Sequence, residues 1–162
     1  MPASDPRIGL LSDTHGLLRP EALDALAGAE RLFHAGDVGS LEILDALEEV
    51  APVHAVRGNT DHGEVADRLP LDQVVDVSVA DRTLRVYVKH IREDIDLDPA
   101  AADIDVVVFG HTHQPSVERR DGVLWVNPGS CGPRRFDLPI TIARLGLDGE
   151  GHPEIQVVDL PV

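Results

Sequence analysis

Residues 7–16 read RIGLLSDTHG, an apolar run that ends directly in a polar cluster. The segment Arg7 to Leu11 has the length and composition of a short buried strand. Asp13 and His15 follow it, at the point where the strand would end. Carboxylate and imidazole groups bind divalent transition metals, but an Asp-x-His pair after a strand is also common in turns and helix caps. Taken alone, the pair leaves both interpretations open.

Similar polar clusters recur after other apolar stretches. They are Gly36-Asp37, Gly58-Asn59-Thr60-Asp61, His90 and Gly110-His111-Thr112-His113. Each has an ordinary explanation when taken singly, because Gly-Asn is typical of turns and a lone histidine at a strand end is more often structural. Their conjunction is informative, since separate strand ends each supply a ligand-capable side chain in an order that can converge on one sheet edge. The sequence therefore predicts a two-metal site.

The secondary-structure pattern changes along the chain. The first part predicts strands over 7–11, 31–34 and 53–56, alternating with helices over 20–29 and 41–49. Such alternation predicts parallel strands with ligands beyond their carboxyl ends. The second part predicts a hairpin of 75–79 and 84–88 around a turn at Asp81-Arg82, a strand over 105–109, a hairpin of 117–120 and 123–126, and strands over 140–145 and 155–160. Two sheets packed face to face, with helices outside, would bury these faces.

Composition excludes several classes of protein. The 162 residues, 43% of them hydrophobic, fit one domain over 1–162. Cys131 is the only cysteine, so neither an internal disulfide nor a thiolate metal cage is possible. A net charge of −15 argues against extended nucleic-acid binding and anionic membranes, and favours a small substrate. Met1 to Leu11 lacks the pattern of a signal peptide or membrane span, and we expect a cytoplasmic protein.

Together, these motifs resemble the calcineurin-like metallophosphoesterases, in particular the small YfcE-type phosphodiesterases of bacteria and archaea. The matching segments are Ser12 to Gly16, His34 to Asp37, Arg57 to Asp61, Gly110 to His113 and Asn127 to Ser130. The resemblance implies an α/β (α+β) fold, a four-layer αββα sandwich of two mixed β-sheets flanked by helices. It implies one metal held by Asp13, His15 and His113, and a second held by Asn59, His90 and His111, with Asp37 bridging both. The expected cofactors are two divalent ions, Mn²⁺ first, with Ni²⁺, Fe²⁺ or Zn²⁺ as alternatives.

The implied reaction is hydrolysis of a small phosphoester, with a phosphodiester as the preferred substrate. A carboxylate at Asp37 would hold the ions roughly 3.5–4 Å apart, and a hydroxide between them would attack phosphorus. The catalytic candidates are Asp37, Asn59, Thr60 and Asp61. Arg134 is a further candidate for binding the substrate phosphate, with an exposed surface arginine as the equal alternative.

Two positions depart from the family pattern. Thr60 stands where many relatives have a histidine that protonates the leaving group, and a hydroxyl is a poor acid near neutral pH. This favours diesters with good leaving groups, unless His62 substitutes. Ile91 stands where the family usually has glycine, which makes His90 the ligand with the least support.

Three alternatives remain open at this stage. One is a non-catalytic interaction scaffold like the retromer subunit Vps29, which shares the fold, and a second is a metal-binding regulatory module without turnover. The third is a phosphomonoesterase or nucleotide phosphatase that uses the same site. A homo-oligomer is compatible with the sequence.

Overall fold

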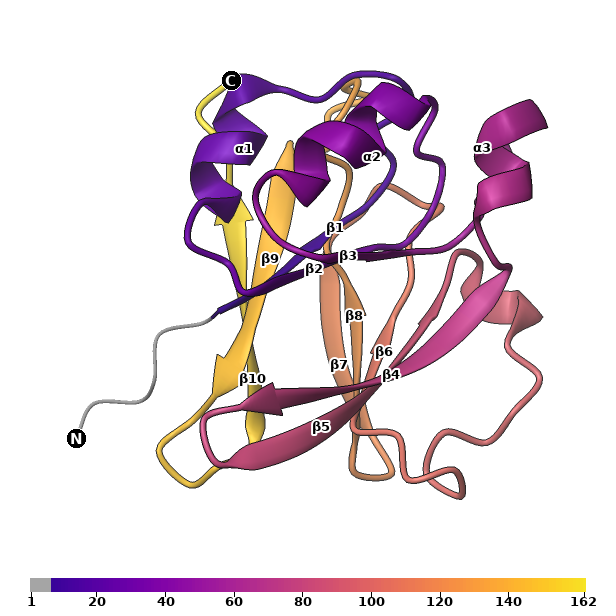
Figure 1. The fold of residues 1–162 in the computed structure, drawn as a ribbon. Coiled ribbons are helices and arrows are strands. Elements are labelled where there is room, and N and C mark those ends of the chain that lie inside the picture. Colours follow the sequence, from indigo (N-terminus) through magenta and orange to yellow (C-terminus); the bar gives the residue numbers. More distant parts are fainter. Residues whose placement is uncertain (1–6) are drawn as a thin grey trace.

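The structure, a computed structural model, describes residues 7–162 and contains two mixed β-sheets that pack against each other (Figure 1). The first sheet has the strand order β10-β9-β1-β2-β3. Its strands are β1 (Ile8–Leu11), β2 (Arg31–His34), β3 (Val53–Ala55), β9 (Thr141–Leu147) and β10 (Pro153–Asp159). The second sheet has the order β4-β5-β6-β8-β7. Its strands are β4 (Asp72–Val79), β5 (Arg82–Lys89), β6 (Val106–Val108), β7 (Ser116–Arg120) and β8 (Val123–Asn127).

The first sheet confirms the predicted alternation of strand and helix. Strands β1, β2 and β3 are parallel, and helices α1 (Pro20–Leu26) and α2 (Leu41–Glu48) connect them. Helix α1 begins at Pro20, whose missing N–H costs nothing in a first turn, and ends at Leu26, before the predicted Ala29. Strands β9 and β10 complete the sheet in antiparallel pairing.

The second sheet combines two hairpins with a parallel centre. Strands β5, β6 and β8 are parallel, whereas β4 pairs antiparallel with β5 and β7 pairs antiparallel with β8. The turn predicted at Asp81-Arg82 lies one residue earlier. Val79 pairs with Arg82, so Ala80 and Asp81 form the loop, and Ala80 takes a positive φ of 55°.

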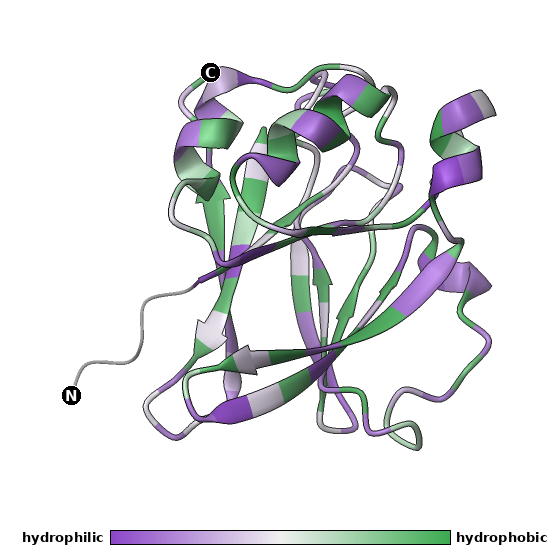
Figure 2. Cartoon of the chain, in the orientation of Figure 1, coloured by the Kyte–Doolittle hydropathy of each residue, from purple (hydrophilic) through white to green (hydrophobic). Residues whose placement is uncertain are grey.

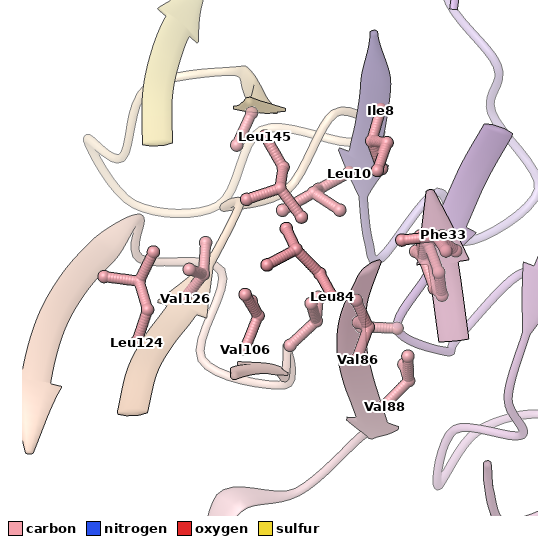
Figure 3. Close-up of a cluster of buried hydrophobic side chains, with 14 of the residues drawn as sticks. Ile8, Leu10, Phe33, Leu84, Val86, Val88, Val106, Leu124, Val126 and Leu145 are labelled. Atoms are coloured by element: carbon pink, nitrogen blue, oxygen red, sulfur yellow. The ribbon is translucent and has the colours of Figure 1, made fainter. Parts of the chain in front are cut away.

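The main core lies between the two sheets. Ile8, Leu10 and Leu145 from the first sheet face Leu84 and Val126 from the second (Figure 3). These side chains are at most 3% exposed, and the alternate residues of each strand point to the other face. Burial of this apolar surface is the main favourable contribution to folding.

The outer faces of the two sheets are covered differently. Helices α1 and α2 cover the first sheet through a second apolar cluster, and both helices carry hydrophobic and hydrophilic residues in alternation (Figure 2). The second sheet is covered by the segment 91–105, in which Ile95, Leu97 and Ile104 pack on Tyr87 and its neighbours. This segment contains the short 3-10 helix η1 (Arg92–Asp94). The sequence pattern predicts neither η1 nor helix α3 (Gly63–Arg68). The predicted fold class, two mixed β-sheets packed together with helices outside, is confirmed.

Among the described residues 7–162, no helix has both the length and the apolar character needed to cross a membrane.

Candidate metal centre

The predicted ligands lie beyond the carboxyl ends of parallel strands from both sheets. Asp13 and His15 follow β1, Asp37 follows β2 and Asn59 follows β3 in the first sheet; His90 follows β5, and His111 and His113 follow β6 in the second. Because parallel strands end at the same edge, each sheet delivers its ligands to one place. The packing of the sheets then brings the two sets together.

One group of ligand atoms surrounds the Oδ1 atom of Asp13. The Nε2 atoms of His15 and His113 each lie 3.4 Å from this oxygen and 3.1 Å from each other. Asp13 is completely buried, and within residues 7–162 its Oδ1 atom has no hydrogen-bond partner. A buried carboxylate oxygen without a donor is costly in free energy, which makes this oxygen the strongest sign that the cluster binds a cation.

A second group forms around Asn59 and His90. The Nε2 atom of His90 lies 2.9 Å from Oδ1 of Asn59 and 3.1 Å from Oδ2 of Asp37. The Nδ1 atom of His111 lies 3.1 Å from the same Asn59 oxygen. Oδ2 of Asp37 is also 3.6 Å from Nε2 of His15, so this oxygen faces both groups. The structure thus brings together all seven predicted ligands, His90 included.

The spacing of these atoms fits metal ions. Nitrogen and oxygen ligands bound at about 2.0–2.2 Å from one ion lie roughly 3.0–3.5 Å from each other in octahedral or tetrahedral geometry. The separations of 2.9–3.6 Å within the two groups match that range. Carboxylate, amide and imidazole ligands suit Mn, Fe, Ni and Zn ions.

Each carboxylate uses one oxygen for the protein and leaves the other facing the histidines. Oδ2 of Asp13 accepts hydrogen bonds from the Ser12 hydroxyl at 2.6 Å and from the His111 backbone N–H at 3.2 Å. Oδ1 of Asp37 accepts a hydrogen bond from the Thr60 backbone N–H at 2.8 Å. These bonds fix the orientation of both carboxylates before any metal binds, as supporting hydrogen bonds do in known metal sites.

The electrostatics of the cluster keep both carboxylates ionised. Burial raises the pKa of Asp13, but the nearby imidazoles of His113 and His15 and the hydrogen bond from Ser12 outweigh it and leave the pKa well below its usual range. Burial likewise raises the pKa of Asp37, and its bonds with His90 and Thr60 lower it overall. Burial lowers the pKa of His90, but the two carboxylates raise it on balance. Both carboxylates are therefore available to bind a cation.

The tautomer of His90 is set by the first sheet. Its Nδ1 atom lies 2.7 Å from the carbonyl oxygen of Ala35, to which it donates, and this leaves Nε2 directed at the cluster. The ring is 3% exposed. A contact that crosses from β5 to the end of β2 also explains why sequence alone supports His90 least, since the contact depends on how the sheets pack.

The backbone is strained at the ligands. Nine non-glycine residues within 7–162 have positive φ, and the predicted ligands Asp13, His15, Asp37, His111 and His113 are five of them, at 46° to 74°. Such conformations cost free energy in L-residues and concentrate at functional sites, where the surrounding structure imposes them. No sequence pattern predicts this strain.

Two glycines of the motifs are required by close approach. A β-carbon at Gly58 would collide with the carboxylate and backbone of Asp37, and one at Gly110 would collide with the Ser12 hydroxyl and lie 2.7 Å from Oδ2 of Asp13. Each glycine directly precedes a ligand, Asn59 or His111. The Gly-Asn and Gly-His motifs thus allow two ligand loops to pass close to the central carboxylates.

The other candidates have different surroundings. The Asp61 carboxylate accepts hydrogen bonds from the backbone N–H groups of Val38, Gly39 and Gly58, at 2.9–3.2 Å, so it ties the loops that carry Asp37 and Asn59. The Thr60 side chain is exposed next to Asn59.

His62 and Arg134 both make local contacts. His62 is exposed, and its Nδ1 atom lies 3.1 Å from the carbonyl oxygen of Thr60. Arg134 is exposed and donates a hydrogen bond to the carbonyl oxygen of Leu138 within its own loop, 3.1 Å away. Neither side chain has a contact with the ligand cluster among the hydrogen bonds and ion pairs of residues 7–162.

Asn127 and Ser130 support the loops that carry the predicted ligands. Asn127 donates to the Gly110 carbonyl oxygen and the Thr112 hydroxyl, both at 3.1 Å, and so holds the loop of His111 and His113. Ser130 donates to the Asp13 carbonyl oxygen at 2.9 Å. The sequence identifies this segment only by its resemblance to a family loop.

His34 is a buried support of the same kind. Its Nδ1 atom accepts a hydrogen bond from the Gly36 N–H at 3.1 Å, so the proton resides on Nε2, which lies 3.0 Å from the Thr14 hydroxyl. Thr14 in turn donates to the Val38 carbonyl oxygen at 2.7 Å. Burial lowers the pKa of His34 to about 4 against the partial opposition of nearby carboxylates. This chain of bonds joins the loops after β1 and β2.

Comparison with known proteins gives a consistent result. Residues 7–150 match the family model of the calcineurin-like phosphoesterase superfamily domain. A probable metallophosphoesterase of Methanothermobacter thermautotrophicus is 36% identical over 151 residues, which cover 88% of this chain and 87% of that protein. Phosphodiesterase YfcE of Escherichia coli K12 is 35% identical over 162 residues, covering 85% of each.

The fold is also that of Vps29. Vps29 of Entamoeba histolytica, solved as a complex with zinc, superimposes with a TM-score of 0.69 and 20% identity, covering 94% of this chain and 98% of Vps29. At this identity the likeness concerns the fold alone.

The stability of the metal-free protein should depend on His34. The unfolded state binds a proton near pH 6.5 and the folded state only near pH 4, so stability should fall as the pH is lowered through this interval. We expect His34 to contribute about 2–3 kcal/mol to that loss. Urea unfolding at several pH values should therefore give a steeper loss for wild type than for His34→Asn. Equal slopes would contradict the assigned neutral state.

Proposed function

The chain belongs to the calcineurin-like phosphoesterase superfamily, and we propose that it hydrolyses phosphodiesters at a site that holds two divalent metal ions. Mn²⁺ is the ion that we propose. The substrate is a small phosphoester, in keeping with the acidic surface of a chain whose net charge is −15.

One observation carries the proposal. Oδ1 of Asp13 is buried, has no hydrogen-bond donor in the described part of the chain and faces the Nε2 atoms of His15 and His113 at 3.4 Å. Neutral imidazole nitrogens and carboxylate oxygens are all electron-pair donors, so their convergence is stable only if protons or cations lie between them. Two such groups adjoin, and Oδ2 of Asp37 faces both, which supports a pair of ions rather than one.

The roles of the residues follow from their positions. Divalent ions, when bound, supply Lewis-acid polarisation of phosphoryl oxygens and an activated water nucleophile. Asp13, His15 and His113 would hold one ion, and Asn59, His90 and His111 the other. Asp37 would hold the two close together, with its second oxygen fixed by the Thr60 N–H. Asp61 positions the loops of Asp37 and Asn59.

The preference for diesters is supported by the surroundings of Asn59, where the described residues offer no effective acid to protonate the leaving group. Thr60 is a weak acid, and His62 is engaged with the Thr60 carbonyl oxygen. The histidines described above face the ligand cluster, where metal binding would use their free electron pairs. Leaving groups that depart without protonation, as in activated diesters, are therefore the better substrates. The relative YfcE is itself named a phosphodiesterase.

The alternative, a non-catalytic scaffold, is distinguished from an enzyme by turnover and not by metal binding. Because Vps29 of E. histolytica was solved with zinc, metal binding does not separate a scaffold from an enzyme. Turnover does.

Activity should require added metal. After chelation, hydrolysis of bis(4-nitrophenyl) phosphate should be lost, and Mn²⁺ should restore it, because the protein's own groups supply no activated nucleophile. Release of 4-nitrophenolate measures the rate. Full turnover in protein shown by elemental analysis to be metal-free would overturn the mechanism, and absence of turnover with every divalent ion would favour the scaffold.

Asp37→Asn should abolish turnover and weaken binding of both ions, because a neutral amide does not balance two adjacent dications. Titration calorimetry with Mn²⁺ on chelated protein should give two sites for wild type. Asp24→Asn, an exposed change of the same type on α1, should leave stoichiometry and rate unchanged. If Asp37→Asn retains both sites and its rate, Asp37 does not join the ions.

Thr60 should make the rate depend steeply on leaving-group acidity. Thr60→His should flatten that dependence, with gains of about 10²–10⁴-fold for poor leaving groups and little gain for good ones. The measurement is a series of diesters with graded phenols and alcohols, assayed with both proteins. A shallow dependence in wild type would mean that another group already protonates the leaving oxygen.

A further inference from the structure

We propose that the hollow beside Asn59 and His90 binds the second substituent of the substrate, and that it selects substituents with one negative charge on an apolar body. The inference rests on the proposed function, because it places the reacting phosphate at the metal centre.

The hollow adjoins the metal centre directly. It is open to solvent, measures about 230 Å³ and includes the metal-ligand candidates Asn59 and His90 in its wall. The remaining lining residues are Arg57, Gly58, Leu71, Lys89, Ile91 and Asp94. A group attached to a phosphate at the metal centre would therefore extend over this surface.

Two cations of the wall come from the strand ends that carry the ligands. Arg57 precedes Asn59 by two residues, after β3, and Lys89 directly precedes His90, at the end of β5. Within residues 7–162, neither side chain forms an ion pair or hydrogen bond, and Nε of Arg57 is buried without an acceptor. An unpaired guanidinium and an unpaired ammonium in the wall of the hollow suit an anionic ligand, whose oxygens would accept their hydrogen bonds.

This absence of partners is unusual for the chain. It contains 29 acidic and 14 basic residues, so acceptors for cations are abundant. Within residues 7–162, eleven basic side chains have a hydrogen-bond or ion-pair partner. The three without one are Arg57, Lys89 and the exposed Arg135. Two of these three therefore face one hollow beside the metal centre.

The other lining residues define the rest of the ligand. Leu71 is 61% exposed, and Ile91 adds a second apolar side chain. Asp94 offsets one of the two cations, which leaves a single net positive charge in the lining. A carboxylate or similar monoanion on an aromatic or aliphatic body matches this wall.

The test compares matched substrates. Hydrolysis of 4-nitrophenyl 3-carboxyphenyl phosphate is compared with that of its neutral 3-carbamoyl counterpart, both with 4-nitrophenolate as the leaving group and Mn²⁺ present. We expect wild type to prefer the carboxylate by about tenfold in kcat/KM, as a charge-assisted hydrogen bond in a partly buried site would give. Arg57→Gln and Lys89→Gln should each reduce this ratio. Arg7→Gln, at the opposite end of β1, is the charge-matched control and should leave it unchanged.

A binding measurement separates this inference from the proposed function. Calorimetry with Mn²⁺-loaded protein compares 3-carboxyphenylphosphonate with 3-carbamoylphenylphosphonate, whose carbon–phosphorus bonds are not phosphoester bonds. Wild type should bind the carboxylate several-fold more tightly, and Arg57→Gln should lose the difference. Diester turnover without either preference would overturn the subsite alone. A binding preference without turnover of any diester would support the subsite and overturn the proposed hydrolysis.

Discussion

The buried carboxylate of Asp13 is the constraint on which the arrangement of the site depends. An ionised group at zero exposure is stable only if every direction around it offers a donor or a cation. Ser12 and the His111 backbone satisfy one oxygen, and two histidines face the other. Because His111 and His113 lie in the loop that follows β6 of the second sheet, this carboxylate also joins the two sheets at their common edge.

Hydrogen bonds between loops keep the ligands in their strained conformations. Asp61 ties the loops after β2 and β3, His34 and Thr14 tie those after β1 and β2, and Asn127 holds the loop after β6. Each bond is made by a buried or half-buried polar group to a neighbouring loop. The positive φ angles of the ligands are therefore imposed by a network rather than by any single residue.

The sequence predicts the convergence of these side chains because strand ends and ligand-capable residue types are local properties. Asp13, Asp37 and Asn59 could be placed at one edge from the alternation of strand and helix alone.

Other features depend on how the two sheets pack. No local pattern in the sequence predicts the contact of His90 with the Ala35 carbonyl oxygen. The same holds for the placement of Arg57 and Lys89 in the wall of one hollow. It also holds for the covering of the second sheet by the irregular segment 91–105, whose apolar residues are spaced too unevenly to predict a helix. The turn lies at Ala80-Asp81 and not at the predicted Asp81-Arg82, because the pairing of Val79 with Arg82 sets the register of the hairpin.

The proposed site would be positively charged, whereas the chain as a whole has a net charge of −15. Two dications would bring four positive charges to the proposed centre, and Asp13 and Asp37 return only two, since the remaining ligands are neutral imidazoles and an amide. The lining of the adjoining hollow adds one more positive charge through Arg57 and Lys89 against Asp94. A small anion is thus attracted over the short range in which these groups act, whereas the acidic surface, with a net charge of −15 for the chain, opposes long polyanions over about a Debye length, ~8–10 Å. On the proposed function, selection for small anionic diesters would follow from this difference in range, without any need for a closed pocket.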